Sequence, residues 1–164
     1  MRNEAFVDIE TSWSGNITIT GVYRPGVGCQ QLIGSQNTAK KILSLLKGVN
    51  GIYTYNGSRF DLPVIYRQTG LNLESCFYHR DLMYDCWKKN LYGGLKRVEV
   101  VLGISRDTQG ITGIDAMNLW ERYKRGEEEA LEVLLRYNRE DVENLEILAS
   151  KLKILERTNK PCRQ

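Results

Sequence analysis

The chain has 164 residues, a length that fits one domain with its own hydrophobic core. Hydrophobic residues make up 41% of it and charged residues 26%, a globular composition that argues against long disordered segments. The formal net charge is only +3, so charge alone gives weak support for a polyanionic partner. We expect a single domain over residues 1–157 and a polar tail over residues 158–164.

The cysteines and the N-terminal residues bear on the cellular compartment. The four cysteines form no CxxC pair, which argues against a structural zinc site. Asp8 and Glu10 interrupt the only apolar run near the N-terminus, and no stretch of the sequence is long enough to span a bilayer. We therefore expect reduced thiols, a cytoplasmic location and no membrane partner.

Periodicity and turn residues predict the secondary structure in chain order. A hairpin turn is expected at Ser14-Gly15-Asn16, and Gly48 is expected to end the first helix. The predicted elements are strands over 4–10, 16–23 and 29–34, a helix over 38–46, a strand over 51–55, a helix over 59–68, a strand over 76–81, helical chain from 82 with a loop near 105–113, and a long helix from 127 to about 156. This order indicates an α/β fold in which helices pack on a mixed sheet.

Two acids stand inside the first predicted strand. Asp8 and Glu10 are two residues apart, so their side chains point to the same face of the strand. Crowding two like charges in an apolar segment is costly unless a cation compensates them, and divalent cations bind carboxylate oxygens. The alternative is an exposed edge strand with a solvated polar face.

Three further acids stand at predicted helix starts. Asp61 follows a strand and a glycine-containing turn, and the helix dipole alone favours an acid at that place. By itself, Asp61 is therefore better explained as structural than as catalytic. Asp81 and Asp115 are interpreted as helix caps, although Asp81 is also a candidate for a fifth acid near a site.

The last long helix carries an acid on its apolar face. Asp141 falls between Leu134 and Leu145 on the helical projection, and Tyr137 lies one turn before it at the edge of the same stripe. An acid buried on the apolar face of a helix is uncommon without a partner. The pair therefore predicts a functional site.

The order of these motifs resembles the DEDD exonuclease superfamily. The segments FVDIET, YNGSRFDLP and YNREDVENL carry the resemblance, which extends from Phe6 to about Leu148. The chain is most similar to the DEDDy subclass, as in the exonuclease domains of family B DNA polymerases. The histidine subclass would place its base at Arg136, whereas the tyrosine subclass places a phenol at Tyr137. His79 is interpreted as a structural residue.

This resemblance implies a ribonuclease-H-like fold with a mixed five-stranded sheet flanked by helices. It also implies a 3′-to-5′ exonuclease that uses two Mg²⁺ or Mn²⁺ ions. Asp8 would bridge both ions, Glu10 and Asp141 would complete one site, and Asp61 would serve the other. Tyr137 would orient the attacking water, because a free phenol has a pKa near 10 and is a poor general base.

The resemblance also suggests residues that contact the substrate, expected to be a DNA or RNA 3′ end, single-stranded in either case. The backbone near Thr11 would meet the terminal 3′-hydroxyl, Asn56 would hydrogen-bond the terminal nucleotide, and Phe60 would stack on it. Lys96, Arg97 and Arg106 are candidate phosphate contacts, with a solvated helix face as an equally good explanation.

Three other functions fit parts of the sequence. An endonuclease such as a ribonuclease H or a junction resolvase carries four acids on the same fold, but normally lacks the Tyr-x-x-x-Asp helix. A non-catalytic nucleic-acid-binding module is disfavoured because all four acids and Tyr137 are present. A protein-interaction domain that happens to carry acids would not bind nucleic acid in a salt-dependent way.

Overall fold

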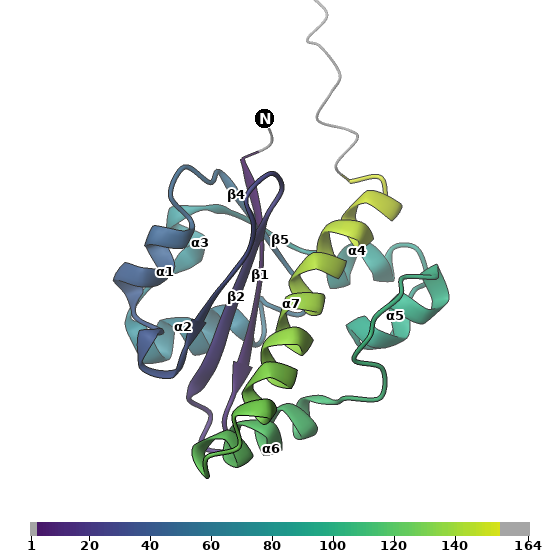
Figure 1. Cartoon of the computed structure of the whole chain (residues 1–164). Coiled ribbons are helices and arrows are strands. Elements are labelled where there is room, and N and C mark those ends of the chain that lie inside the picture. Colours follow the sequence, from purple (N-terminus) through teal and green to yellow (C-terminus); the bar gives the residue numbers. More distant parts are fainter. Residues whose placement is uncertain (1–2, 155–164) are drawn as a thin grey trace, which may run out of the picture.

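A mixed five-stranded sheet forms the centre of the structure, a computed structural model that describes residues 3–154 (Figure 1). The strand order is β3-β2-β1-β4-β5. The strands are β1 (Glu4–Thr11), β2 (Ile17–Arg24), β3 (Gly28–Ile33), β4 (Gly51–Thr54) and β5 (Tyr78–Asp81). β1, β4 and β5 run parallel, whereas β2 and β3 are antiparallel to their neighbours. The expected fold class is confirmed.

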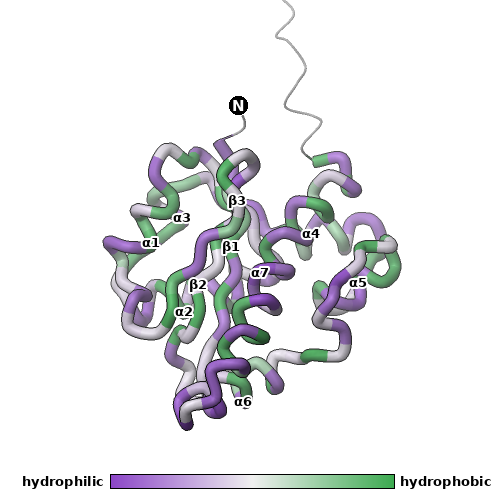
Figure 2. Tube along the Cα trace, in the orientation of Figure 1, coloured by the Kyte–Doolittle hydropathy of each residue, from purple (hydrophilic) through white to green (hydrophobic). Residues whose placement is uncertain are grey.

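Helices cover both faces of this sheet. They are α1 (Ala39–Leu45), α2 (Asp61–Thr69), α3 (Leu73–Cys76), α4 (Leu82–Trp87), α5 (Leu95–Leu102), α6 (Gly113–Lys124) and α7 (Glu128–Lys151), with a 3₁₀ turn η1 (Gly34–Gln36) before α1. α1 and α2 pack on one face, and α7 crosses the other (Figure 1). Hydrophobic and hydrophilic residues alternate along α7, as expected for a helix with one buried face (Figure 2).

The alternation of β1 decides which face carries the acids. Val7 and Ile9 join the apolar cluster beneath α1 and α2, whereas Phe6 packs with residues of α7. Because successive side chains of a strand point to opposite faces, Asp8 and Glu10 share the α7 face with Phe6. The first two acids therefore face the helix that carries Asp141.

Most predicted elements are confirmed, with four corrections. Leu46, not Gly48, is the C-cap of α1. The short helix α3 was not predicted, and it includes Cys76, so the strand predicted over 76–81 begins at Tyr78.

The prediction ran the last helix to about residue 156, but α7 ends at Lys151. Lys153 adopts φ 58°, and the amide of Ile154 donates to the carbonyl of Ala149, so the chain turns back and buries Ile154. The continuous helical stretch after residue 82 is also wrong, because residues 88–94 separate α4 from α5. The predicted tail, 158–164, lies outside the described residues.

None of the helices within residues 3–154 combines the length and the apolar composition needed to cross a bilayer.

A glycine in β2 allows α7 to approach the sheet closely. Gly21 pairs with Asp8, and a Cβ atom at position 21 would lie 2.2 Å from Oδ1 of Asn138 on α7. Asn138 is fully buried and donates a hydrogen bond of 3.0 Å to the Asp8 carboxylate. It also accepts one of 2.9 Å from Gln31. This contact fixes the height of α7 above the strand that carries Asp8.

We predict that Gly21→Ala lowers the free energy of unfolding by about 1–3 kcal/mol, because the added methyl group must displace Asn138. Chemical denaturation of the metal-free protein measures the change. Gly51→Ala is the matched control, since the nearest atom to its Cβ lies 3.5 Å away and its stability should change by less than about 1 kcal/mol. Equal effects of the two substitutions would show that the contact with Asn138 is not close.

Candidate active site

The acids gather where two parallel strands of the sheet part. β1 and β4 are paired from Glu4 to Phe6, but β1 continues to Thr11. The amide of Ile9 therefore has no partner on β4, and Oδ1 of Asp61 accepts its hydrogen at 2.9 Å. The carboxyl ends of parallel strands are the usual place for a binding crevice in an open α/β sheet.

Three of the four predicted metal ligands lie close enough to share one ion. Asp8, Glu10 and Asp141 each offer a carboxylate oxygen, and these oxygens lie within 4.8 Å of one another. We call these residues the acidic cluster. Asp61 is not part of this set, although it is buried beside it and bonded to the strand between Asp8 and Glu10. Carboxylate oxygens at this spacing could hold a divalent cation.

Burial and mutual repulsion make the acids hard to ionise. Burial raises the pKa of Asp8 well above its usual range, and the charges of Asp141, Asp61 and Glu10 raise it further. Burial followed by the charge of Asp141 does the same for Glu10. Burial raises the pKa of Asp61 to about 7 against the hydrogen bond from Ile9, which lowers it. A bound divalent cation would relieve this repulsion.

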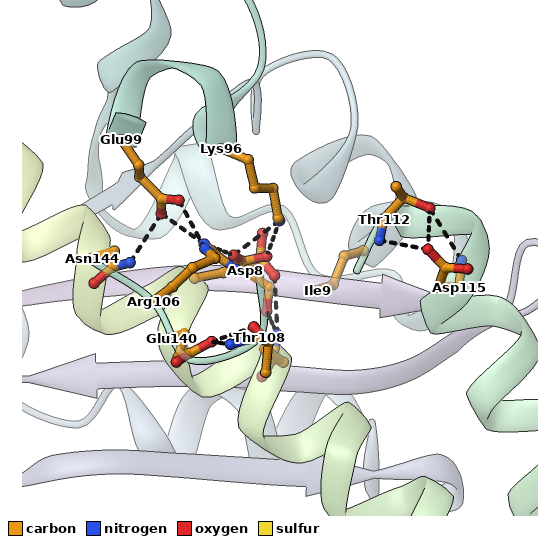
Figure 3. A network of polar contacts seen from close by, with 12 residues as sticks. Asp8, Ile9, Lys96, Glu99, Arg106, Thr108, Thr112, Asp115, Glu140 and Asn144 are labelled. Atoms are coloured by element: carbon orange, nitrogen blue, oxygen red, sulfur yellow. Dashed lines mark hydrogen bonds and ion pairs between the residues drawn. The ribbon is translucent and has the colours of Figure 1, made fainter. Parts of the chain in front are cut away.

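Two basic side chains compensate part of the negative charge. Lys96 Nζ lies 2.9 and 2.8 Å from the two carboxylate oxygens of Asp141, and Arg106 Nη2 lies 2.6 Å from Oδ1. Figure 3 shows Lys96 reaching from α5 toward this point beside Asp8. Burial alone would lower the pKa of Lys96, but the Asp141 carboxylate raises it on balance, so Lys96 is charged. A carboxylate has about four acceptor positions, which leaves Asp141 capacity for a metal ion.

A buried polar network holds Arg106 in place. Its guanidinium makes two hydrogen bonds to Glu99, of 2.8 and 2.6 Å, and Asn144 donates to Glu99 at 3.0 Å (Figure 3). The side chains of Arg106 and Glu99 are 5% and 2% exposed, so the guanidinium of Arg106 lies inside the protein and not on a solvated helix face. Its observed partners are the carboxylates of Glu99 and Asp141 rather than solvent. Glu99 was not among the predicted site residues, although its four-residue spacing from Leu95 places it on the buried face of α5.

Glu140 fastens the loop that carries Arg106. Its carboxylate accepts hydrogen bonds from the amides of Asp107 and Thr108, at 2.6 and 3.1 Å, and from the Thr108 hydroxyl. Helical periodicity predicts that Glu140 lies on the solvated side of α7, opposite the apolar stripe, but Glu140 is partly buried under this loop. Adjacent residues of α7 thus bind the loop and its arginine separately.

A cleft of about 870 Å³ borders Asp8, Lys96 and Asp141. Its charged part contains Asp8, Asp141 and Lys96, with the phenol of Tyr137 beside them. The full lining is Asp8, Tyr55, Asn56, Met83, Trp87, Gly93, Gly94, Leu95, Lys96, Gly110, Ile111, Thr112, Gly113, Tyr137 and Asp141. Of the predicted substrate contacts, Asn56 and Lys96 are in this lining. Thr11 and Phe60 are not, and Phe60 stands 42% exposed just before α2.

Tyr137 is positioned as a neutral hydrogen-bonding group. Its residue is 3% exposed, and Lys96 Nζ lies 4.2 Å from the centre of its ring. Burial raises the pKa of Tyr137, and the charges of Glu10 and Asp141 raise it further. The charge of Lys96 lowers the pKa, but the net change is upward. The phenol therefore keeps its proton at neutral pH, which suits orientation of a water molecule and not its deprotonation.

The residues interpreted as structural have structural contacts. Asp81 caps α4 by accepting from the amide of Met83, and it also accepts from the amides of Asn56 and Ser58. Asp115 forms a capping box with Thr112 at the start of α6. His79 Nε2 lies 2.9 Å from the hydroxyl of Thr54, outside the acidic cluster.

A comparison with known protein families gave a match. The model of a family described as the RNase H superfamily matches residues 5–153, which include the acidic cluster, Asp61 and Tyr137. No curated protein matches the chain.

We predict that Asp8→Asn stabilises the metal-free protein increasingly as pH rises. The folded pKa of Asp8 lies above its unfolded value near 4, so its contribution is favourable below about pH 4 and is lost as pH rises through the folded pKa. Asparagine avoids this loss and can still accept from Asn138. Thermal unfolding in EDTA between about pH 5 and 8 measures the difference from wild type.

The exposed Glu127→Gln is the control, and its difference from wild type should not grow with pH in this way. A less stable Asp8→Asn protein at the upper pH would mean that the carboxylate is net stabilising and that the acidic cluster is not under repulsion.

We predict that Glu99→Met lowers the free energy of unfolding by about 3–5 kcal/mol, because it leaves the buried Arg106 short of a charge partner. Glu127→Met removes the exposed partner of Arg122 and should cost at most about 1 kcal/mol. Urea denaturation of both variants gives the comparison. Similar small losses would show that Arg106 finds other compensation.

Proposed function

The chain belongs to the RNase H superfamily, and we propose that it is a metal-dependent 3′-to-5′ exonuclease of the DEDDy type. Membership of the superfamily supports a nuclease that hydrolyses phosphodiester bonds. The observation that carries the finer proposal is the phenol of Tyr137, which lines the cleft together with Asp8 and Asp141. A buried tyrosine four residues before a metal-binding aspartate is the feature by which the tyrosine subclass differs from the endonucleases of this fold.

The acids divide into two groups in this proposal. Asp8, Glu10 and Asp141 would hold one Mg²⁺ or Mn²⁺ ion, because their oxygens already lie within 4.8 Å of one another. Asp61 would serve a second ion together with Asp8, which its charge already influences. The bound ions would make a water molecule more acidic and neutralise charge on the leaving oxygen, an effect worth several kcal/mol.

The other residues of the site act on the water and on the phosphate. Tyr137 keeps its proton and would hydrogen-bond the attacking water, which fixes the direction of attack. Lys96 is charged and reaches the same point on a flexible stem, so it would contact the scissile phosphate when an ion neutralises Asp141. Arg106, held by Glu99 inside the protein, would keep Asp141 in position throughout.

An assay on labelled oligonucleotides tests the activity and its polarity. With Mn²⁺ or Mg²⁺, the full chain should shorten 5′-labelled single-stranded DNA or RNA from the 3′ end into a descending ladder. EDTA and Asp8→Asn should each abolish the ladder, because both remove metal binding at the acidic cluster. Glu127→Gln should retain it, since that acid lies in an exposed ion pair.

The substrate separates the alternatives. Blocking the 3′ hydroxyl should stop an exonuclease, whereas an endonuclease would still cut within the strand. Metal-dependent cutting of a substrate with a blocked 3′ end would therefore show that the protein is an endonuclease and not an exonuclease. Salt-dependent binding without any hydrolysis would indicate a non-catalytic module instead.

A further inference from the structure

The cleft has an apolar part that the proposed chemistry does not use. Asp8, Asp141 and Lys96 supply its charged part, whereas Trp87, Met83 of α4 and Tyr55 contribute rings and a thioether to the rest. The volume of about 870 Å³ is near the upper end of the range for ligand pockets, far more than metal ions and a phosphate require. This part of the cleft is suited to a flat apolar group attached to the phosphate.

Trp87 offers a ring that is held in place but is not part of the core. It is the last residue of α4 and is partly buried, yet among the described residues it joins none of the three hydrophobic clusters. The rings of Tyr84 and Trp87 form a T-shaped pair, with centroids 5.4 Å apart and planes at 89°. An indole that is held by a neighbouring ring and borders a cleft is suited to stacking.

A cation lies over one face of this ring. The guanidinium carbon of Arg59 lies 5.8 Å from the centre of the Trp87 ring, and within residues 3–154 Arg59 makes no ion pair. The turn before Arg59 is fixed, because Asp81 accepts from the amides of Asn56 and Ser58. The positive charge is therefore positioned at one face of the indole, and a base would stack on the opposite face.

We propose that Trp87 is a stacking platform for one nucleobase of the substrate strand and that Arg59 contacts the backbone of the same strand. This subsite rests on the proposed function, because it assumes that the strand enters the cleft that contains Asp8 and Asp141. It also assigns the stacking role to a residue in the cleft lining, whereas Phe60 is outside that lining.

The geometry selects an unpaired strand. A base inside a duplex stacks on its neighbours with both faces, so it cannot also stack on the indole, whereas an unpaired base can. Stacking on an aromatic ring tolerates every base, so binding should depend little on sequence. The platform therefore favours unpaired bases over bases inside a duplex, and it discriminates weakly among the bases.

Binding of a non-cleavable complex tests the platform. The Asp8→Asn protein, which is expected not to cut, is titrated with a short 5′-fluorescein-labelled oligothymidylate or oligouridylate, and fluorescence anisotropy measures the binding. Adding Trp87→Ala should weaken binding about 10- to 100-fold. Trp87→Phe should restore most of the affinity because it keeps an aromatic face. Trp13→Ala, which removes an exposed indole outside the cleft, should leave affinity unchanged.

A scan with abasic nucleotides identifies the partner of the ring. One abasic position should weaken binding to the protein with Trp87 but not to Trp87→Ala, because the two changes remove the same contact. Equal penalties at every position in both proteins, or full affinity of Trp87→Ala, would overturn the platform. Melting temperatures of the variants show whether a loss of affinity reflects unfolding.

The outcomes separate this inference from the proposed function. If wild type shortens oligonucleotides from the 3′ end while Trp87→Ala binds normally, only the platform is refuted. If wild type neither binds nor shortens any oligonucleotide, the proposed function fails and the platform fails with it.

Discussion

The structure depends on holding like charges together at the point where β1 and β4 part. Three carboxylate oxygens within 4.8 Å would repel one another strongly in a buried site, and the fold offsets this with Lys96 and Arg106 on Asp141. Each surrounding feature contributes to this balance. The parted strands give Asp61 the amide of Ile9, and the α5 helix supplies both Lys96 and Glu99.

The two basic residues have different freedom. Arg106 is almost fully buried, with Glu99 on one side and Asp141 on the other, and the loop that carries it is fastened by Glu140. The Lys96 side chain is 38% exposed and borders the cleft. A divalent ion that binds Asp141 would therefore share this carboxylate with two cations. Arg106 is held inside the protein, whereas Lys96 can move into the cleft.

Local periodicity was sufficient to predict how the three residues of the acidic cluster lie on their elements. The two-residue spacing of Asp8 and Glu10 gave their common face, and the helical projection placed Asp141 on a buried stripe. Contacts between residues that are far apart in the sequence leave no such periodic pattern in it. Nothing near Glu140 in sequence indicates that it binds the amides of residues 107 and 108, and Trp87 enters the cleft only because α4 follows the edge strand. The end of α7 escaped prediction for a similar reason, since a distant apolar cluster buries Ile154.

The contact between Gly21 and Asn138 has a consequence for sequence variation. Two positions 117 residues apart share one small volume, because the space that a side chain on β2 would occupy is filled by an amide from α7. Divergent members of the same lineage are therefore expected to exchange bulk between these positions, with a larger residue at 21 accompanied by a shorter one at 138. Such paired substitutions would keep the spacing between β2 and α7 and would replace the hydrogen bond from Asn138 to Asp8 by another contact.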